Sequence, residues 1–190
     1  MEKPKPERTE FAWERMREQS GTPKNSRGLL LLGERFGFRE NGSLKVDFDE
    51  KVIEFDPSSW NHLKRLERIL KRTLLEELEP AVAYYSKKLG VGFKRITIRK
   101  PRTRWGSCSP DGNLNFNLQL VCLPPDLIRY VACHEVAHLK ENHHGRAFWK
   151  IVRNEFENYR EMKKRLSEYW SFFRETNFFL DPGKASHLPR

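Results

Sequence analysis

Four of the six histidines in this chain lie between positions 134 and 144. His134, Glu135 and His138 form the pattern H-E-x-x-H. On a helix, side chains four residues apart project from the same side, so His134 and His138 can offer two imidazole nitrogens to one cation. Glu135 then lies beside that cation, where a carboxylate can accept a proton from water. The pattern predicts zinc-hydrolase chemistry.

A catalytic zinc site uses three protein ligands and keeps one position open, so a third ligand is needed. His144 follows His134 by ten residues, the offset of the third histidine in the pattern H-E-x-x-H-x-x-G-x-x-H. We therefore predict a site for one Zn²⁺ per chain, with another divalent metal as an alternative occupant. His143 is a candidate for contact with substrate, and Glu141 and Glu155 are lesser candidate ligands.

Two other interpretations of the histidine cluster are open. The histidines can be ordinary core or surface residues, or a zinc ion can be purely structural, with Cys108 or Cys133 closing its fourth position. The second case would describe a binding module instead of an enzyme. Cys133 adjoins His134 and therefore points about 100° away around the helix, which favours a packing role.

The ligand set predicts a mechanism in which zinc lowers the pKa of a water molecule towards about 7 and Glu135 removes its proton. The target is a carbonyl or phosphoryl centre. Residues 113–120 alternate apolar and amide side chains, which predicts a strand directly before the metal helix. An exposed edge of this strand could hold an extended peptide, with Asn115 and Asn117 lining the cleft. The alternative is that both amides face solvent.

The formal net charge is +10, and residues 80–110 contain basic but no acidic side chains. The basic residues of this stretch are Lys87, Lys88, Lys94, Arg95, Arg99, Lys100, Arg102 and Arg104. Such a stretch attracts phosphate, nucleic acid or acidic substrates, although a solvated surface would look the same. It motivates two alternative functions. One is a nucleotide pyrophosphate hydrolase in which Arg99, Arg102 and Arg104 neutralise phosphate, and the other is a zinc-stabilised nucleic-acid-binding module that uses Lys94 to Arg104.

The chain length of 190 residues suits one domain, which we place at residues 29–176 between tails at 1–28 and 177–190. A short helix is plausible within the first tail, at residues 11–19. From Leu29 onward, apolar residues at period two around Asn41-Gly42 predict a hairpin, and residues 51–55 predict a third strand. Capping oxygens at residues 56–59 then precede leucines at helical spacing, which predicts a long helix.

Proline and glycine punctuate the remaining elements. Pro80 should kink the long helix or start a second one, and Gly90 should end it. Residues 95–99 alternate like a strand and lead into a glycine-containing loop. Pro125 suits the first turn of the metal helix, and aromatic residues at helical spacing predict further helices from Phe148 to residue 175.

Several observations bear on the cellular location. No apolar run reaches the roughly 18 residues that a membrane helix needs, and the first 20 residues lack a signal-peptide core. The three cysteines form no C-x-x-C pair, which argues against a disulfide framework. We therefore expect a cytoplasmic protein without a membrane partner.

The string Arg104-Trp105-Gly106-Ser107-Cys108-Ser109 resembles a stretch typical of the YgjP-like metal-dependent hydrolases, a family grouped with the zincin-type metallopeptidases. The likeness runs over residues 29–170 and continues through Gly112, Leu114, Asn117, Leu120, Pro124, Tyr130, Val131, His134, Glu135, His138, His144, Phe148 and Trp149. Val136, His143 and Gly145 depart from the usual family residues. A second likeness, to SprT-type proteases, rests on His144, Gly145 and Phe148.

The resemblance implies a zincin-like α+β fold. Its elements would be N-terminal antiparallel strands, a long helix, a small sheet, the H-E-x-x-H helix and C-terminal helices. It also implies metal-dependent hydrolase activity, and nucleotide pyrophosphate hydrolysis has been attributed to family members. From the residues and the resemblance together, we expect a zinc-dependent peptidase that acts on peptides or proteins.

Overall fold

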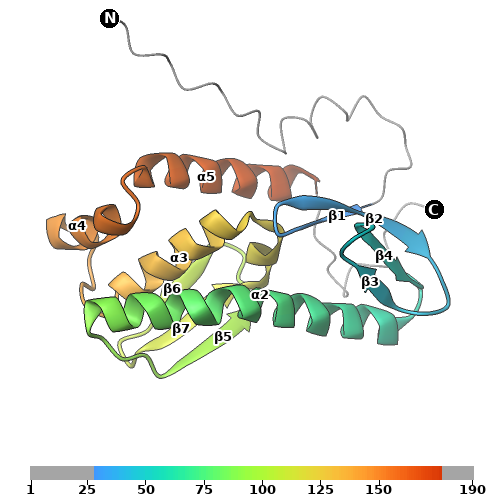
Figure 1. Ribbon diagram of the computed structural model, residues 1–190, viewed down its shortest axis with the longest axis horizontal. Coiled ribbons are helices and arrows are strands. Elements are labelled where there is room, and N and C mark those ends of the chain that lie inside the picture. The colour runs from blue at the N-terminus through green and yellow to red at the C-terminus, as the bar shows by residue number, and fades with distance from the viewer. Residues whose placement is uncertain (1–27, 177–190) are drawn as a thin grey trace, which may run out of the picture.

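The computed structural model describes residues 28–176, with side chains to Arg174. The long helix α2 (Trp60–Leu89) runs along most of the molecule, as Figure 1 shows. A sheet of four strands lies beside its N-terminal half, and a sheet of three strands lies with helix α3 along its C-terminal half. The expected α+β class and order of elements are confirmed.

The first sheet has the strand order β1-β2-β4-β3. Its strands are β1 (Gly28–Leu31), β2 (Glu34–Glu40), β3 (Lys45–Asp47) and β4 (Val52–Phe55). The strand expected at residues 51–55 is confirmed as β4. The sheet is mixed because β4 pairs parallel to β2 and antiparallel to β3. The expectation of purely antiparallel N-terminal strands is therefore wrong.

The hairpin in this sheet joins β1 to β2 and turns at Leu32 and Gly33, which have φ values of 52° and 83°. The expectation of a hairpin at Asn41-Gly42 is wrong. Asn41 is instead attached to β4, because its backbone N–H donates to the carbonyl of Phe55 and its side chain donates to Glu54. Strand β4 thereby lies between β2 and β3.

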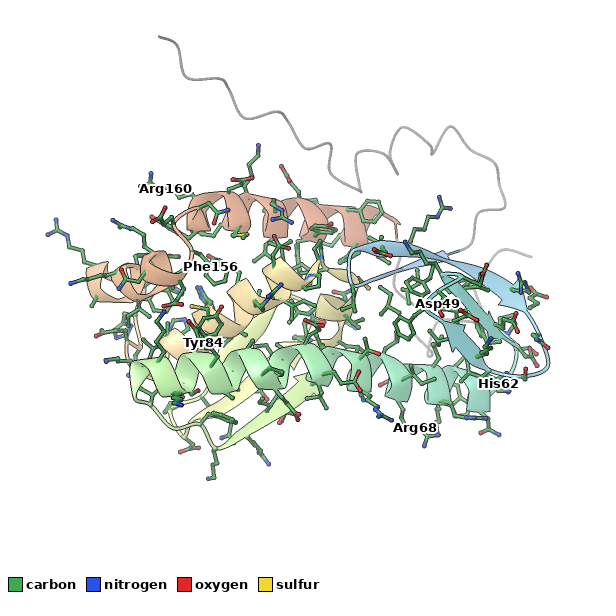
Figure 2. All side chains as sticks on the ribbon, in the orientation of Figure 1. Asp49, His62, Arg68, Tyr84, Phe156 and Arg160 are labelled. Carbon is green, nitrogen blue, oxygen red and sulfur yellow. The ribbon has the colours of Figure 1, made fainter. Side chains whose placement is uncertain are left out.

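Helix α2 begins and ends as its sequence predicts. The hydroxyl of Ser59 accepts a hydrogen bond from the backbone N–H of His62, whose ring Nδ1 accepts one from the backbone N–H of Asp56. Figure 2 labels His62 at this end of the helix. Gly90 ends the helix in the left-handed region at φ 66°. The helix continues through Pro80, so Pro80 does not start a second helix. Pro80 is exposed, where water can satisfy the carbonyl that loses its helical partner.

The second sheet has the order β5-β7-β6, with β5 parallel and β6 antiparallel to the central β7. Its strands are β5 (Arg95–Arg99), β6 (Gly106–Cys108) and β7 (Asn113–Asn117). Strand β7 is shorter than expected, because a 3₁₀-helix, η1 (Leu118–Cys122), starts where the Asn117 side chain accepts from the N–H of Gln119. Both edges of β7 are paired, so the expectation that it offers an exposed edge is wrong. The edges left unpaired in this sheet belong to β5 and β6.

Three helices complete the described residues, and they are α3 (Pro125–Ala137), α4 (Arg146–Glu155) and α5 (Tyr159–Thr176). Pro125 occupies the first turn of α3, as expected. Side-chain ion pairs tie the helices together: Arg165 on α5 binds Asp126 on α3, and Lys88 on α2 binds Glu155 on α4. No helix among the described residues is long and apolar enough to cross a membrane. The predicted tails and the helix expected at residues 11–19 lie outside the described residues.

Candidate metal centre

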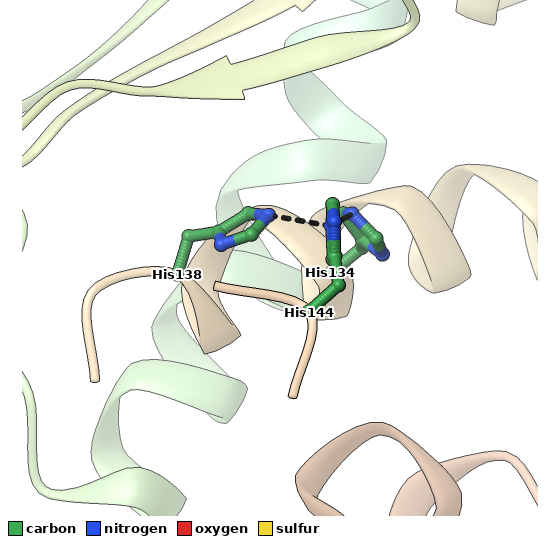
Figure 3. Close-up of side chains that lie close together, drawn as sticks. All are labelled: His134, His138 and His144. Atoms are coloured by element: carbon green, nitrogen blue, oxygen red, sulfur yellow. Dashed lines mark hydrogen bonds between the residues drawn. The ribbon is translucent and has the colours of Figure 1, made fainter. Parts of the chain in front are cut away.

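The imidazoles of His134, His138 and His144 converge on one point, as Figure 3 shows. The Nε2 atom of His144 lies 3.0 Å from the Nε2 atoms of both His134 and His138. Tetrahedral zinc with Zn–N bonds of 2.0–2.1 Å separates its ligand nitrogens by about 3.3 Å. The three residues therefore fit the zinc site expected from their spacing.

The chain turn after α3 brings the third histidine back to the first two. Helix α3 ends at His138, and the ring Nδ1 of His138 lies 3.1 Å from the carbonyl oxygen of Glu141. This carbonyl can only accept a hydrogen bond, so Nδ1 carries the proton and Nε2 keeps a lone pair for a metal. Glu141 thus supports a ligand through its backbone instead of acting as one. The indole of Trp149 stacks on His144 at a centroid distance of 5.6 Å.

The surroundings of the first two histidines keep them neutral, as a metal ligand must be. Burial lowers the pKa of His134 to about 3, and the neighbouring His138 and His144 rings act in the same direction. Burial also lowers the pKa of His138. Because burial favours the neutral form of both rings, their Nε2 lone pairs are available to a cation.

Glu135 follows His134 on α3 and is 5% exposed. Burial raises the pKa of its carboxyl to about 8, against a smaller opposite effect of Arg104. The side chain lies directly over Gly106 of β6. A Cβ atom at position 106 would lie 2.6 Å from Oε1 of Glu135 and 2.7 Å from its Cγ. Gly106 therefore makes room for this carboxylate.

The two cysteines considered as zinc ligands do not join the cluster. Among the described residues, the atoms that converge are those of the three histidines alone. Cys133 is fully buried, and burial raises the pKa of its thiol to about 12. Cys108 lies on β6, and burial followed by the charge of Glu135 raises its pKa. Glu155 is occupied by its ion pair with Lys88.

A model of the family described as YgjP-like, metallopeptidase domain, matches residues 12–169. The chain belongs to this family. The match confirms the resemblance carried by the Arg104–Ser109 string and the histidine pattern, and it identifies a metallopeptidase domain with a histidine triad that could hold a metal ion. It begins at residue 12, inside the segment expected to be a tail.

Two solved structures are similar to this YgjP-like domain. The metallopeptidase zymogen of Pyrococcus abyssi abylysin is 23% identical at a TM-score of 0.46, covering 48% of this chain and 93% of its own. The metallopeptidase zymogen of Methanocaldococcus jannaschii jannalysin is 22% identical at a TM-score of 0.44, covering 48% of this chain and 95% of its own. A comparison with curated proteins finds no match.

The residues expected to contact substrate in the YgjP-like domain lie in different environments. Arg102, Arg104 and His143 are exposed, and Asn115 is half-buried. Asn117 is 1% exposed, and its amide donates to the carbonyls of Pro101 and Arg104. Asn117 therefore holds the loop before β6 in place, and its amide group is used for hydrogen bonds within the fold.

The basic stretch of the YgjP-like domain does not form one patch. Lys88 pairs with Glu155, and Lys100 pairs with Glu67. Arg95, Arg99 and Arg104 instead gather at a hollow on the three-stranded sheet. The arginines expected to neutralise phosphate are thus only partly brought together, because Arg102 is not among the residues that line the hollow.

Sequence reasoning missed the role of Gly106. The glycine stands inside the Arg104–Ser109 string, but its contact with Glu135 joins two segments that are far apart in the chain. The available signal was a glycine within a strand, which often marks a close approach of another group to the backbone.

Proposed function

We propose that this YgjP-like domain is a zinc-dependent peptidase in which His134, His138 and His144 hold the metal and Glu135 is the general base. The observation that carries the proposal is the convergence of three Nε2 atoms, together with a buried carboxyl group that directly follows the first of these histidines on α3. One Zn²⁺ per chain suits a set of three neutral imidazoles, and the family match supports a peptide substrate.

When bound, zinc would supply Lewis acidity that makes water a nucleophile near neutral pH and polarises the scissile carbonyl. The carboxylate of Glu135 accepts the proton of the attacking water at an Oε atom. Burial raises the pKa of Glu135, so its carboxylate binds this proton more strongly than an exposed carboxylate would, before passing it to the leaving amine. Glu135 thereby serves both proton transfers of peptide hydrolysis.

Strand β6 supports binding of an extended peptide beside Glu135. The carbonyl of Trp105 and the N–H of Ser109 form backbone hydrogen bonds with β7. In an antiparallel pair, the N–H and C=O groups of successive residues point to opposite edges, so those of Gly106 and Cys108 point to the edge of β6 that faces away from β7. Among the described strands, none pairs with that edge. A peptide added there would place its backbone along the residue that contacts Glu135.

The proposal is tested with the purified chain and two variants, by elemental mass spectrometry and by cleavage of a mixed peptide library. Glu135→Gln should keep about one zinc per chain and lose about 10²- to 10⁴-fold of the activity, because only the base is removed. His144→Ala should lose both zinc and activity. His143→Ala is the matched control for metal content, since its ring lies outside the triad.

Two outcomes would contradict the proposal. A Glu135→Gln variant that still cleaves peptides would remove Glu135 from the mechanism. Turnover of nucleoside triphosphates without cleavage of any peptide would instead favour the pyrophosphate hydrolase alternative, which Arg99, Arg102 and Arg104 motivate. The zinc-stabilised nucleic-acid binder would be indicated by salt-dependent binding without hydrolysis.

A further inference from the structure

A hollow of about 370 Å³ lies on the face of the β5-β7-β6 sheet that points away from the core. Its polar lining consists of Arg95, Arg99, Arg104, Ser107, Asn113 and Asn115, with Ser109 at the end of β6. The metal centre is built from α3 and the turn after it, so the hollow is a separate feature of the molecule.

The pairing of the strands produces this face. Arg95 lies opposite Asn113 and Arg99 opposite Asn117 on β7, while Ser107 lies opposite Asn115. Side chains alternate between the two faces of a strand, so the residues between these, such as Ile96 and Ile98, pack towards the core. Arginine, amide and hydroxyl groups therefore form neighbouring rows on one face.

The hollow has an excess of positive charge that the described residues do not neutralise. Arg95, Arg99 and Arg104 take part in none of the ion pairs among those residues, and no carboxylate lines the hollow. Arg39, in contrast, pairs with Glu54, and Arg72 pairs with Glu76. Three guanidinium groups around one hollow repel each other, and an anionic ligand would relieve that repulsion.

The other groups of the hollow favour a peptide over a nucleic acid. Single-stranded nucleic acid is commonly held by aromatic side chains on which bases stack. The aromatic residue at this hollow, Phe116, has its side chain fully buried in the core. Trp105 packs edge-on against Trp170, at a centroid distance of 4.7 Å. The hollow thus presents forked donors for carboxylates and no stacking surface.

The spacing of the arginines suits an extended acidic chain. Arg95 and Arg99 are four residues apart on one strand, which separates their backbones by about 13 Å. In an extended peptide, side chains on one face recur about every 7 Å. When every second residue is acidic, two carboxylates can lie opposite Arg95 and Arg99, with a third above the space between them. Ser107 and Asn115 lie within that space and can bond to the peptide backbone.

We propose that this hollow binds acidic segments of extended peptides and recruits them to the metal centre. Gly106 borders the hollow, while its Cα faces Glu135 on the other side of β6, so a peptide held in the hollow reaches the catalytic carboxylate around the free edge of β6. The binding site stands on its own geometry, whereas its role in choosing substrates rests on the proposed peptidase function.

The test measures binding directly, by fluorescence anisotropy on the full-length, zinc-loaded chain. The probe is a labelled octapeptide of alternating glutamate and alanine, and a peptide with glutamine for glutamate is its uncharged control. A single-stranded DNA octamer is the competing polyanion. Mass spectrometry after each titration verifies that the peptide is intact, so binding is scored separately from hydrolysis.

The double variant Arg95→Gln/Arg99→Gln should weaken binding of the acidic peptide by about tenfold or more, because each guanidinium–carboxylate bond is charge-assisted. The matched control is Arg65→Gln/Arg68→Gln on the exposed side of α2, where Arg68 points away from the molecule (Figure 2). This control removes the same charge elsewhere and should change the affinity less than about twofold.

Three outcomes would overturn the inference. They are no binding of the acidic peptide to the wild-type chain, equal weakening in both double variants, and DNA binding that depends on Arg95 and Arg99 while the peptide does not bind.

If the chain is a peptidase, Arg95→Gln/Arg99→Gln should also raise KM for acidic substrates about tenfold, with kcat for these substrates and the kinetics of neutral substrates unchanged. Loss of peptide binding with intact hydrolysis of neutral peptides would separate failure of this inference from failure of the proposed function.

Discussion

At the scale of single residues, the side chain of Gly106 is one hydrogen atom, and this leaves room for the carboxylate of Glu135. The two residues come from different elements, β6 and α3, and their contact sets the position of the proposed base. The spacing of His134, His138 and His144 predicted the triad, because two ligands share one helix and the third follows within a short turn. The Gly106 contact could not be predicted, since it depends on how the sheet packs on the helix.

Gly106→Ala should therefore impair catalysis without removing the metal. The new Cβ would lie 2.6 Å from Oε1 of Glu135, so the carboxylate must move by several tenths of an ångström or more. Misplacement of a catalytic group by about 1 Å can cost about 10²-fold in rate, so we expect a loss of this order in kcat. Kinetics on a cleaved peptide and zinc content by elemental mass spectrometry test the prediction.

The matched control is Gly92→Ala, because a Cβ at that position meets no atom within 4 Å. It should leave kcat and zinc content unchanged. A Gly106→Ala variant with normal kcat would show that Glu135 does not need this space, and one that loses zinc would show a general structural effect instead of a positioning role.

At the scale of elements, the β1–β2 hairpin supports the start of the metal helix. The backbone N–H groups of Leu32 and Gly33 donate to the carbonyls of Val121 and Cys122 in η1, directly before α3. Alternation predicted these strands, and capping residues predicted both ends of α2. The strand pairing was not predictable in the same way, because Asn41-Gly42 is a strong local turn signal that the hydrogen bonds to β4 override.

Gly33→Ala should destabilise the domain through this contact. Gly33 has a φ of 83°, which disfavours a side chain, and a Cβ there would lie 2.7 Å from Cγ of Pro124. We expect a loss of about 2 kcal/mol in the free energy of unfolding, measured by urea denaturation. Gly37→Ala in β2 has open space around its Cβ and should change stability by less than about 0.5 kcal/mol. Equal stability of the two variants would argue against a tight hairpin contact.

At the scale of the whole molecule, one metal ion would add a link between α3 and the segment that leads into α4. His134 lies on α3, which packs on α2, and His138 caps the C-terminal end of α3, whereas His144 lies two residues before α4. Exposed polar residues fill much of the turn between α3 and α4, so the bound metal would add a crosslink between the two helices. An ion that binds the native state alone stabilises it in proportion to the logarithm of its free concentration.

Zinc should therefore raise the melting temperature of the full chain. With free zinc at about 1,000 times Kd, the gain is about 4 kcal/mol, which corresponds to an increase in Tm of about 10 °C for a domain of this size. Differential scanning fluorimetry with buffered zinc and with a chelator measures the difference. His144→Ala should lose most of this shift, because its two remaining ligands both lie on α3 and no longer tie that helix to α4. His143→Ala should keep the shift. A shift of the same size in His144→Ala would place the stabilising ion at a different set of ligands and would contradict the three-histidine site.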